Sequence, residues 1–328
     1  MKILLFAALA LVADPPQESK GALKVFVLAG QSNMQGHGAL KTLDRLGQHP
    51  THGHLLAKLK KPDGSYTVRD DVWIHYQRDP KTLKKGKLTA GFGAGDDKIG
   101  PEWVFGQVVG DAFEEPVLLV KTAWGGRSLA VNFRPPGAGG ETGETYKEML
   151  ALVRGALENL DRDFPELAGR KPELAGFAWF QGWNDMIDQK KVDEYESNLA
   201  HLIRDLRKDL GAPKLPVVVG ELGVGGEASA AKNPRMAAFR KAQAGPSKMP
   251  EFEGTVAFVP TTPYWDREAE EFLEKHWVKR KWSSDEAKAE WEKMGSQPPY
   301  HYLGSARIYS LVGHGLGEAM LKLCGRTP

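Results

Sequence analysis

The chain has 328 residues, of which 41% are hydrophobic and 26% are charged, so it can bury a large core without resembling a membrane protein or a disordered tail. Its 44 lysines and arginines against 42 aspartates and glutamates leave a net charge of +2, with no basic stripe of the kind that follows nucleic-acid phosphates. We therefore expect no nucleic-acid partner. The single cysteine, Cys324, excludes an internal disulfide and a cysteine-rich zinc site.

An apolar stretch opens the chain. Lys2 supplies a positive charge, residues 3–13 are apolar, and an aspartate and two prolines follow at once. This pattern is typical of a signal peptide, here residues 1–13, with cleavage after Ala10 or after Ala13. The stretch is too short to cross a bilayer as a helix. We expect a secreted or periplasmic protein with no integral membrane segment after signal cleavage.

Short apolar runs rich in β-branched residues alternate with longer segments of helical periodicity in the rest of the chain. This alternation predicts a three-layer α/β/α sandwich around a five-stranded, mostly parallel, doubly wound sheet. The predicted strands are residues 24–28, 116–121, 174–180, 215–220 and 255–259. The clearest predicted helices are residues 144–160, 190–210 and 303–321, where apolar residues recur every three or four positions.

Two segments do not follow this alternation. Residues 36–100 are rich in Gly, His and Lys, with one strand-like run at 72–76, and are predicted to lie over the sheet as an insertion. Residues 263–299 are helical and highly charged, and we interpret both segments as loops or lids of one domain that covers residues 24–325. The second segment contains Trp265, Trp277, Trp282 and Trp291. These either stack on sugar rings or fill the core, which is the commoner role of aromatic residues in helices.

The first predicted strand runs into Gly30-Gln31-Ser32-Asn33-Met34, which places Ser32 just beyond the carboxyl end of a buried strand. Ligands bind at this edge in open α/β sheets. Ser32 has two interpretations: it caps a helix, or it is a nucleophile whose neighbouring backbone N–H groups stabilise an oxyanion. Taken alone, the segment favours the cap.

Three further segments shift that balance. Gly125 and Gly126 follow the second predicted strand, and glycines let backbone N–H groups approach a ligand closely. Gln181-Gly182-Trp183-Asn184-Asp185 follows the third strand and offers amides and a carboxylate. His301 lies just before the last predicted helix, where an imidazole can face the same edge of the sheet.

These segments together resemble a known family. Gly-Gln-Ser-Asn-Met at 30–34, Gly-Gly-Arg-Ser at 125–128, Trp-Phe-Gln-Gly at 179–182 and a final His are similar to the sequence blocks of the SGNH hydrolase superfamily. Within it, the chain most resembles the sialate O-acetylesterase-like carbohydrate esterases, over roughly residues 24–321. The resemblance implies an acetylesterase that acts on acetylated carbohydrate, either sialate or a plant or algal polysaccharide, without metal or cofactor.

Carried over block by block, the resemblance implies that Ser32 is the nucleophile and His301 the general base. The backbone N–H groups of Ser32 and Gly126 would line the oxyanion hole. The third oxyanion donor stays open, because the superfamily spacing points to Asn184 and the closer esterases point to Gln181. Three further residues are candidate substrate contacts: Arg127, Arg134 and Gln31.

The chain departs from the family pattern at the acid. The superfamily usually has an Asp three residues before the His, where this chain has Pro298, and the Glu used by other relatives is Trp183 here. The group that orients His301 is then Asp185, Asp266, another residue or a backbone carbonyl, and we favour Asp185. The missing acid motivates one alternative function, a non-catalytic carbohydrate-binding protein on the same scaffold. A short-chain lipase or thioesterase is another.

Overall fold

The structure is a computed structural model that describes residues 20–327, so the predicted signal peptide at 1–13 lies outside the described residues. The central sheet is formed by β1 (Ala22–Gly30), β3 (Val72–Asp79), β4 (Thr82–Lys87), β6 (Val117–Ala123), β7 (Lys171–Phe180), β8 (Val217–Gly220) and β9 (Val256–Val259). Its order is β4-β3-β6-β1-β7-β8-β9. β4 pairs antiparallel with β3, and all other neighbours are parallel.

The predicted α/β/α architecture is confirmed, but the sheet has seven strands instead of five. All five predicted strands are present, as β1, β6, β7, β8 and β9. The two additional strands, β3 and β4, come from segment 36–100, so this part of the predicted insertion extends the sheet and does not lie over it. β4 reads Thr-Leu-Lys-Lys-Gly-Lys and forms the edge, where lysines discourage pairing with another chain.

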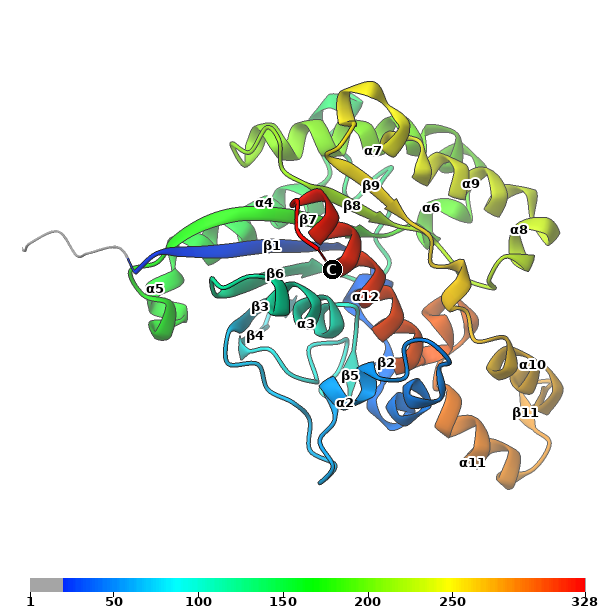
Figure 1. The fold of residues 1–328 in the computed structure, drawn as a ribbon. Coiled ribbons are helices and arrows are strands. Elements are labelled where there is room, and N and C mark those ends of the chain that lie inside the picture. Colours follow the sequence, from blue (N-terminus) through cyan, green and yellow to red (C-terminus); the bar gives the residue numbers. More distant parts are fainter. Residues whose placement is uncertain (1–19, 328) are drawn as a thin grey trace, which may run out of the picture.

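Long helices cover both faces of the sheet (Figure 1). α3 (Glu102–Ala112) and α12 (Ala306–Leu323) pack against each other on one face. The other face carries α4 (Glu144–Glu158), α7 (Gln189–Asp209) and α9 (Pro234–Ala244). The helices predicted at 144–160, 190–210 and 303–321 correspond to α4, α7 and α12, whereas the sequence pattern did not predict α3 or α9.

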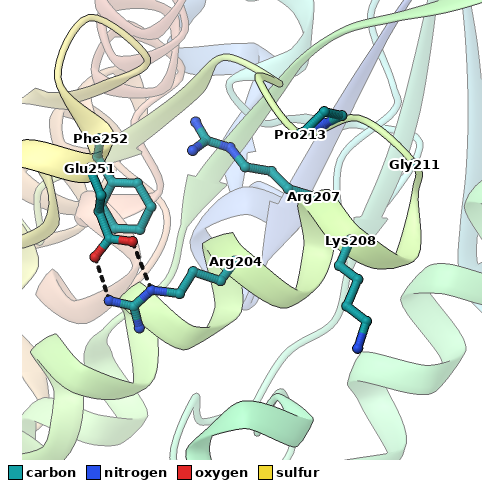
Figure 2. A pocket seen from close by; sticks show the side chains of 7 residues that line it. All are labelled: Arg204, Arg207, Lys208, Gly211, Pro213, Glu251 and Phe252. Carbon is teal, nitrogen blue, oxygen red and sulfur yellow. Dashed lines mark hydrogen bonds and ion pairs between the residues drawn. The ribbon is translucent and has the colours of Figure 1, made fainter.

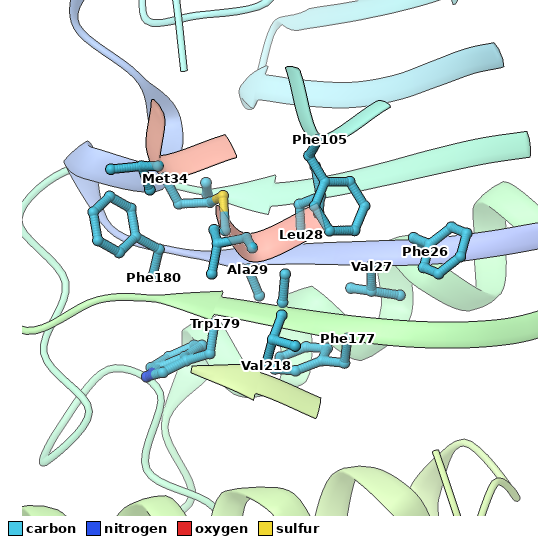
Figure 3. Close-up of a cluster of buried hydrophobic side chains, with 14 of the residues drawn as sticks. Phe26, Val27, Leu28, Ala29, Met34, Phe105, Phe177, Trp179, Phe180 and Val218 are labelled. Carbon is cyan, nitrogen blue, oxygen red and sulfur yellow. The ribbon is translucent and has the colours of Figure 1, made fainter. Parts of the chain in front are cut away.

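The core surrounds β1 and β7 on both faces (Figure 3). On one face, Phe26 of β1 meets Phe105 of α3 with ring centroids 5.7 Å apart. On the other, Trp179 of β7 donates a hydrogen bond from Nε1 to the hydroxyl of Tyr195 in α7 at 3.2 Å. Successive side chains of a strand point to opposite faces, so a strand covered on both faces is apolar throughout. This is why these strands were recognisable in the sequence.

The remaining elements are short, and η denotes a 3₁₀ helix. They are α1 (Ser32–Gln35), β2 (Gly38–Ala39), η1 (Leu40–Gln48), α2 (Leu55–Leu59), β5 (Lys98–Ile99), η2 (Pro136–Ala138), α5 (Leu160–Asp163), η3 (Pro165–Leu167), α6 (Trp183–Met186), α8 (Ala228–Lys232), η4 (Pro246–Lys248), η5 (Pro250–Phe252), η6 (Thr262–Tyr264), α10 (Arg267–His276), β10 (Trp277–Val278), β11 (Lys281–Trp282), α11 (Asp285–Met294) and η7 (Pro299–Gly304). β2 pairs with β5, and β10 pairs with β11. In Figure 1, α10, β11 and α11 lie together beyond one end of the sheet. Within residues 20–327, no helix combines the length and apolar character that crossing a membrane requires.

A buried ion pair connects the sheet to α1. Lys121 of β6 and Glu102 of α3 are both fully buried, with Nζ 2.7 Å from Oε2. The ammonium also donates to the carbonyl oxygens of Phe92 and Gln35, each at 2.8 Å. Burial lowers the pKa of Lys121. Because three acceptors surround this one cation, the C-terminal end of α1 is held at a fixed distance from the sheet.

Candidate active site

Three predicted segments meet at the carboxyl edge of the three central strands. Ser32 begins α1 directly after β1, the glycine pair follows β6, and Gln181 follows β7. β1 lies between β6 and β7 in the sheet, so these three loops are neighbours. Gly30 permits the close approach, because a Cβ there would lie 2.2 Å from the carbonyl oxygen of Phe180.

Ser32 is not a helix cap. Gln31 occupies the N-cap position of α1, which has no side-chain cap hydrogen bond. The Ser32 side chain is 7% exposed, and its Oγ lies 3.5 Å from Nε2 of Gln31. A Cβ on Gly125 would lie 3.8 Å from Cβ of Ser32, so the glycine loop is directly beside the hydroxyl. Gly126, next in the loop, has φ +72°, a conformation that favours glycine.

The Gln31 side chain connects the start of α1 to the loop after β7 through hydrogen bonds. Its Oε1 accepts hydrogen bonds from the backbone N–H of Gly182 (3.1 Å) and Asn184 (3.2 Å), and from Nε2 of Gln181 (3.1 Å). Its Nε2 donates to Oδ1 of Asn184 at 2.9 Å. The side chain is buried and both of its polar atoms are engaged. The predicted role of Gln31 as a substrate contact is therefore corrected to one of support.

The two candidates for the third oxyanion donor differ in how free their amide groups are. Nε2 of Gln181 already lies within hydrogen-bond distance of Gln31, of the Arg127 carbonyl (3.0 Å) and of Asp185 Oδ2 (2.6 Å). In contrast, Asn184 is fixed through its Oδ1, and its Nδ2 has no hydrogen-bond partner among residues 20–327. The geometry favours Asn184.

The structure does not place Asp185 against His301. Oδ2 of Asp185 accepts from the backbone N–H of Leu129 and Oδ1 from that of Ala130, both at 2.9 Å, and Gln181 also binds Oδ2. Burial raises the pKa of this carboxyl group, and these donors oppose the rise. Asp185 therefore anchors the loop after β6. The prediction that it orients His301 is corrected, because both of its oxygens are already bound elsewhere.

The carboxylate of Asp266, the other candidate acid, is also bound to groups other than His301. Its carboxylate binds Arg45 and Arg307 and caps α10 through the backbone N–H of Ala269. Although burial opposes ionisation, the two guanidinium groups hold the pKa of Asp266 below its usual value. Nδ1 of His301 is buried and has no hydrogen-bond partner in the described part of the chain.

His301 instead stacks on another histidine, His37, which the sequence analysis missed. The two rings are parallel within 4°, with centroids 3.9 Å apart. Nδ1 of His37 is likewise buried without a hydrogen-bond partner in the part of the chain described. Burial, followed by the charge of Lys98, lowers the pKa of His301 to about 4. The signal in the sequence was Gly36-His37-Gly38, a histidine between glycines shortly after Ser32.

The Asn33 side chain connects α1 to the loop that carries His301. Its Nδ2 donates to the carbonyl oxygen of Tyr300 at 3.2 Å, and its Oδ1 accepts from the hydroxyl of Tyr309 at 2.9 Å. That hydroxyl also lies 3.2 Å from the carbonyl oxygen of His301. Ser32 is thus next in sequence to Asn33, and His301 is next in sequence to Tyr300, so these hydrogen bonds hold the two candidate catalytic residues near each other. No hydrogen bond joins their side chains within residues 20–327, and catalytic hydrogen bonds often form fully only with substrate present.

The backbone after His301 is strained. Tyr302 (φ +50°), Leu303 (φ +58°) and Gly304 (φ +62°) adopt the left-handed conformation in succession. Each such non-glycine residue costs about 1–3 kcal/mol, and such strain is concentrated at functional sites. The Tyr302 side chain is held by the backbone N–H of Gly223 at 2.8 Å. This turn also explains why α12 begins later than predicted.

The two candidate arginines have different surroundings. The guanidinium group of Arg134 donates to the carbonyl oxygens of Ala130, Ala138 and Gly139 and pairs with Glu194, so it stabilises its own loop. Arg127 is exposed, and its guanidinium group forms no hydrogen bond or ion pair with the rest of residues 20–327. Only Arg127 is therefore free to bind a substrate.

Another part of the chain forms a basic pocket (Figure 2). It has a volume of about 460 Å³ and is lined by Arg204, Arg207, Lys208, Gly211, Pro213, Glu251 and Phe252. Arg204 already pairs with Glu251. The lining residues lie in the C-terminal part of α7 or precede β8 and β9, so the pocket is at the amino edge of the sheet, opposite Ser32.

Known proteins resemble this chain over most of its length. Residues 22–259 match the model of a family described as carbohydrate esterase, sialic acid-specific acetylesterase. A probable carbohydrate esterase of Arabidopsis thaliana is 23% identical over 210 residues, which are 62% of this chain and 70% of that protein.

Two solved structures share the fold. An Arabidopsis thaliana protein has a TM-score of 0.55 at 18% identity, covering 91% of this chain and 97% of that one. A carbohydrate acetylesterase from Xanthomonas citri has a TM-score of 0.52 at 14% identity, covering 92% of this chain and 56% of that one. The family match spans well over half of the chain and includes three of the four loops that meet around Ser32. The chain therefore belongs to the sialic acid-specific acetylesterase family of carbohydrate esterases.

Proposed function

We propose that this protein is a secreted carbohydrate O-acetylesterase that works through an acyl-enzyme on Ser32. The observation that supports it most is that Gln31 couples Ser32 to an Asn184 amide with an uncommitted Nδ2. Export rests on the apolar pattern of residues 1–13 alone, and N-terminal sequencing of the mature protein would check it.

In the proposed reaction, Oγ of Ser32 attacks the acetyl carbonyl carbon while its proton moves to His301. The resulting oxyanion is stabilised by the backbone N–H groups of Ser32 and Gly126 and by Nδ2 of Asn184. The C–O bond to the sugar then breaks, and His301 returns the proton to the departing sugar hydroxyl. Water, deprotonated by His301, attacks the acyl-enzyme in the same way and releases acetate.

The direct test measures acetate release by the wild-type protein from p-nitrophenyl acetate, O-acetylated sialate and acetylated xylan. We expect turnover of p-nitrophenyl acetate and of at least one acetylated sugar. Failure on every acetylated substrate would contradict the proposal and favour a binding protein. A strong preference for octanoyl over acetyl esters would favour a lipase or thioesterase.

We further propose that His37 positions His301 in place of the missing carboxylate. The parallel stack covers one face of the His301 ring, while the backbone on either side is fixed by Asn33 and Tyr309. The other groups facing the His301 ring are Lys98 and Tyr300, and Lys98 and Lys121 act on the His37 ring, so none of these groups is a carboxylate. The ring can therefore be restrained by packing alone.

The pH profile tests this arrangement. The base must be neutral to accept a proton, and a pKa of about 4 keeps His301 neutral over most of the accessible range. We expect the acid limb of kcat/KM to fall near pH 4 in the wild type, since this limb reports the free enzyme. In His37→Ala the midpoint of this limb should move to higher pH, towards 6.5, the pKa of a free histidine. The reason is that the His301 ring becomes more hydrated.

His37→Phe is the matched control, because it keeps an aromatic face against His301. Its acid limb should stay closer to that of the wild type than the limb of His37→Ala does. If the two variants have the same profile as the wild type, the stack has no part in positioning the base.

Arg127 provides a test of substrate charge. Its exposed guanidinium group lies on the loop beside Ser32, so it is well placed for the carboxylate of a sialate. If sialate is the substrate, Arg127→Ala should raise KM for O-acetylated sialate by roughly tenfold or more, as expected for a lost hydrogen bond to a charged group, with a smaller effect on neutral sugars. Steady-state kinetics on both substrates measures the difference.

Arg134→Ala serves as the comparison for Arg127. It removes three contacts inside one loop and the ion pair with Glu194 of α7, so its main effect should be a lower melting temperature. Equal KM changes for Arg127→Ala on charged and neutral substrates would show that Arg127 does not recognise a carboxylate.

A further inference from the structure

His301 lies on a tight hairpin that has a second surface. The backbone N–H groups of Ser296 and Gln297 donate to the carbonyl oxygen of Leu303 at 2.7 and 3.1 Å, which closes residues 296–304. The N–H of His301 donates to the carbonyl oxygen of Pro298 at 3.0 Å inside this loop. Any molecule that binds the outer side of the hairpin is therefore close to the catalytic base.

That outer side forms part of a pocket of about 240 Å³. The pocket is lined by Leu273, Trp277, Trp282, Trp291, Ser296, Gln297, Pro298 and Pro299. Pro299 is two residues from His301, so their Cα atoms are at most about 7 Å apart. The tryptophans come from the segment 263–299, which lies outside the region that matches the family. The pocket thus borders the loop that carries His301, and both lie beyond the matched residues 22–259.

The three indole rings form a series that runs from the core to the surface. Ring centroids are 6.0 Å apart between Trp291 and Trp282, and 5.0 Å apart between Trp282 and Trp277. Trp291 is buried, whereas Trp277 is 41% exposed. Burial in the core, the alternative role of these tryptophans, therefore accounts for Trp291 but not for Trp277. An exposed indole beside a pocket offers a flat apolar face to a ligand.

A second aromatic pair links this pocket to the catalytic centre. Trp183 and Tyr300 have ring centroids 5.7 Å apart, and Tyr300 is 40% exposed. Trp183 directly precedes Asn184, and Tyr300 directly precedes His301. Together with the exposed prolines of the hairpin, these rings extend an aromatic surface from the proposed oxyanion donor towards Trp277.

We propose that the pocket around Trp277 and Trp282 binds a neutral sugar residue of an oligosaccharide whose acetylated residue lies at Ser32. None of the eight lining side chains is charged, which fits a neutral sugar better than a sialate. Ser296 and Gln297 supply polar groups for hydroxyls beside the indole faces. The volume is below the roughly 300–1,000 Å³ of pockets for drug-sized ligands, so it suits a single ring. The inference rests on the proposed esterase function for its catalytic meaning.

Binding is measured first with unacetylated xylohexaose, cellohexaose and mannohexaose, by calorimetry and tryptophan fluorescence. We expect at least one of these probes to bind the wild type. Trp277→Ala should weaken that binding about tenfold, as for other aromatic stacking contacts, and Trp277→Tyr should restore part of it. Val278→Ala is the matched control, because Val278 is exposed on the same β10–β11 hairpin and does not line the pocket.

Kinetics then connects the pocket to the reaction. The fall in kcat/KM caused by Trp277→Ala should be larger on an acetylated xylo-oligosaccharide than on p-nitrophenyl acetate. Absence of binding to all three probes, or equal effects of Trp277→Ala and Val278→Ala, would overturn the inference. So would a selective loss of p-nitrophenyl octanoate turnover, which would assign the pocket to an acyl chain. Tryptophan-dependent binding without any acetate release would instead refute the proposed esterase while the sugar site stands.

Discussion

Replacement of Ser32 by alanine is expected to lower kcat for acetate release by about 10³- to 10⁶-fold and to leave the fold intact. The hydroxyl is the attacking group in the proposed reaction, so its loss removes the acyl-enzyme route. It makes little contribution to stability, because within residues 20–327 its hydrogen-bond contacts are limited to Nε2 of Gln31 at 3.5 Å, and it does not cap α1. Acetate release and a thermal melt followed by circular dichroism measure the two effects separately.

Ser65→Ala is the control for this experiment. Ser65 lies in an exposed turn, where its hydroxyl binds Asp63, so its removal should leave turnover unchanged. Residual activity of Ser32→Ala within about tenfold of the wild type, equivalent to about 1.4 kcal/mol in the barrier, would refute the nucleophile assignment.

Asn184→Ala is expected to lower kcat by roughly 10²- to 10³-fold, the usual cost of one oxyanion donor. The substitution also removes Oδ1, which accepts the 2.9 Å hydrogen bond from Nε2 of Gln31, so the melting temperature should fall, but by less than in Gln181→Ala, which loses several buried hydrogen bonds. Asn184→Asp should be at least as inactive, because it keeps the acceptor for Gln31 and places a negative charge where the oxyanion develops. Single-turnover kinetics on p-nitrophenyl acetate would isolate the acylation step.

Gln181→Ala provides the contrast. The Gln181 side chain bonds Gln31, Asp185 and Tyr195 in a buried network, so its removal should lower the melting temperature by several degrees. If Gln181→Ala loses kcat without a change in melting temperature while Asn184→Ala is nearly silent, then Gln181 is the oxyanion donor.

The parts of the fold that could be predicted are those buried on both faces. Residues 25–30 of β1 and 174–180 of β7 are continuous apolar runs because helices cover both faces of these parts of the strands. α3 was missed for a related reason. It is buried on nearly all sides between the sheet and α12, and it contains Gly106 and Gly110, so it shows no amphipathic period. β4 was missed because an edge strand needs few apolar residues.

The site shows the same division. The segments that contain Ser32 and Asn184 could be located because each begins at the end of a central parallel strand, which fixes the edge at which it lies, but the choice between Gln181 and Asn184 as oxyanion donor stayed open. The hydrogen-bond partners of Asp185 could not be predicted from the sequence, because a buried carboxylate after a strand can face either the ligand or the next loop. Here the backbone N–H groups of Leu129 and Ala130 donate to the two carboxylate oxygens, so Asp185 faces the next loop. His37 was missed because its contact with His301 depends on long-range packing.

α1 contains only four residues, far fewer than the roughly 12–15 that a helix needs to be even marginally stable alone. The geometry of Ser32 is therefore imposed from outside, by Lys121 at one end of the helix and by the contacts of Asn33 with Tyr300 and Tyr309. The proposed nucleophile therefore depends on residues outside its own sequence segment. If Gly-Gln-Ser-Asn-Met were grafted into the strand-to-helix turn of another scaffold, the serine would be transferred without Lys121, Tyr300 and Tyr309. The graft would therefore lack the contacts that fix the orientation of the serine.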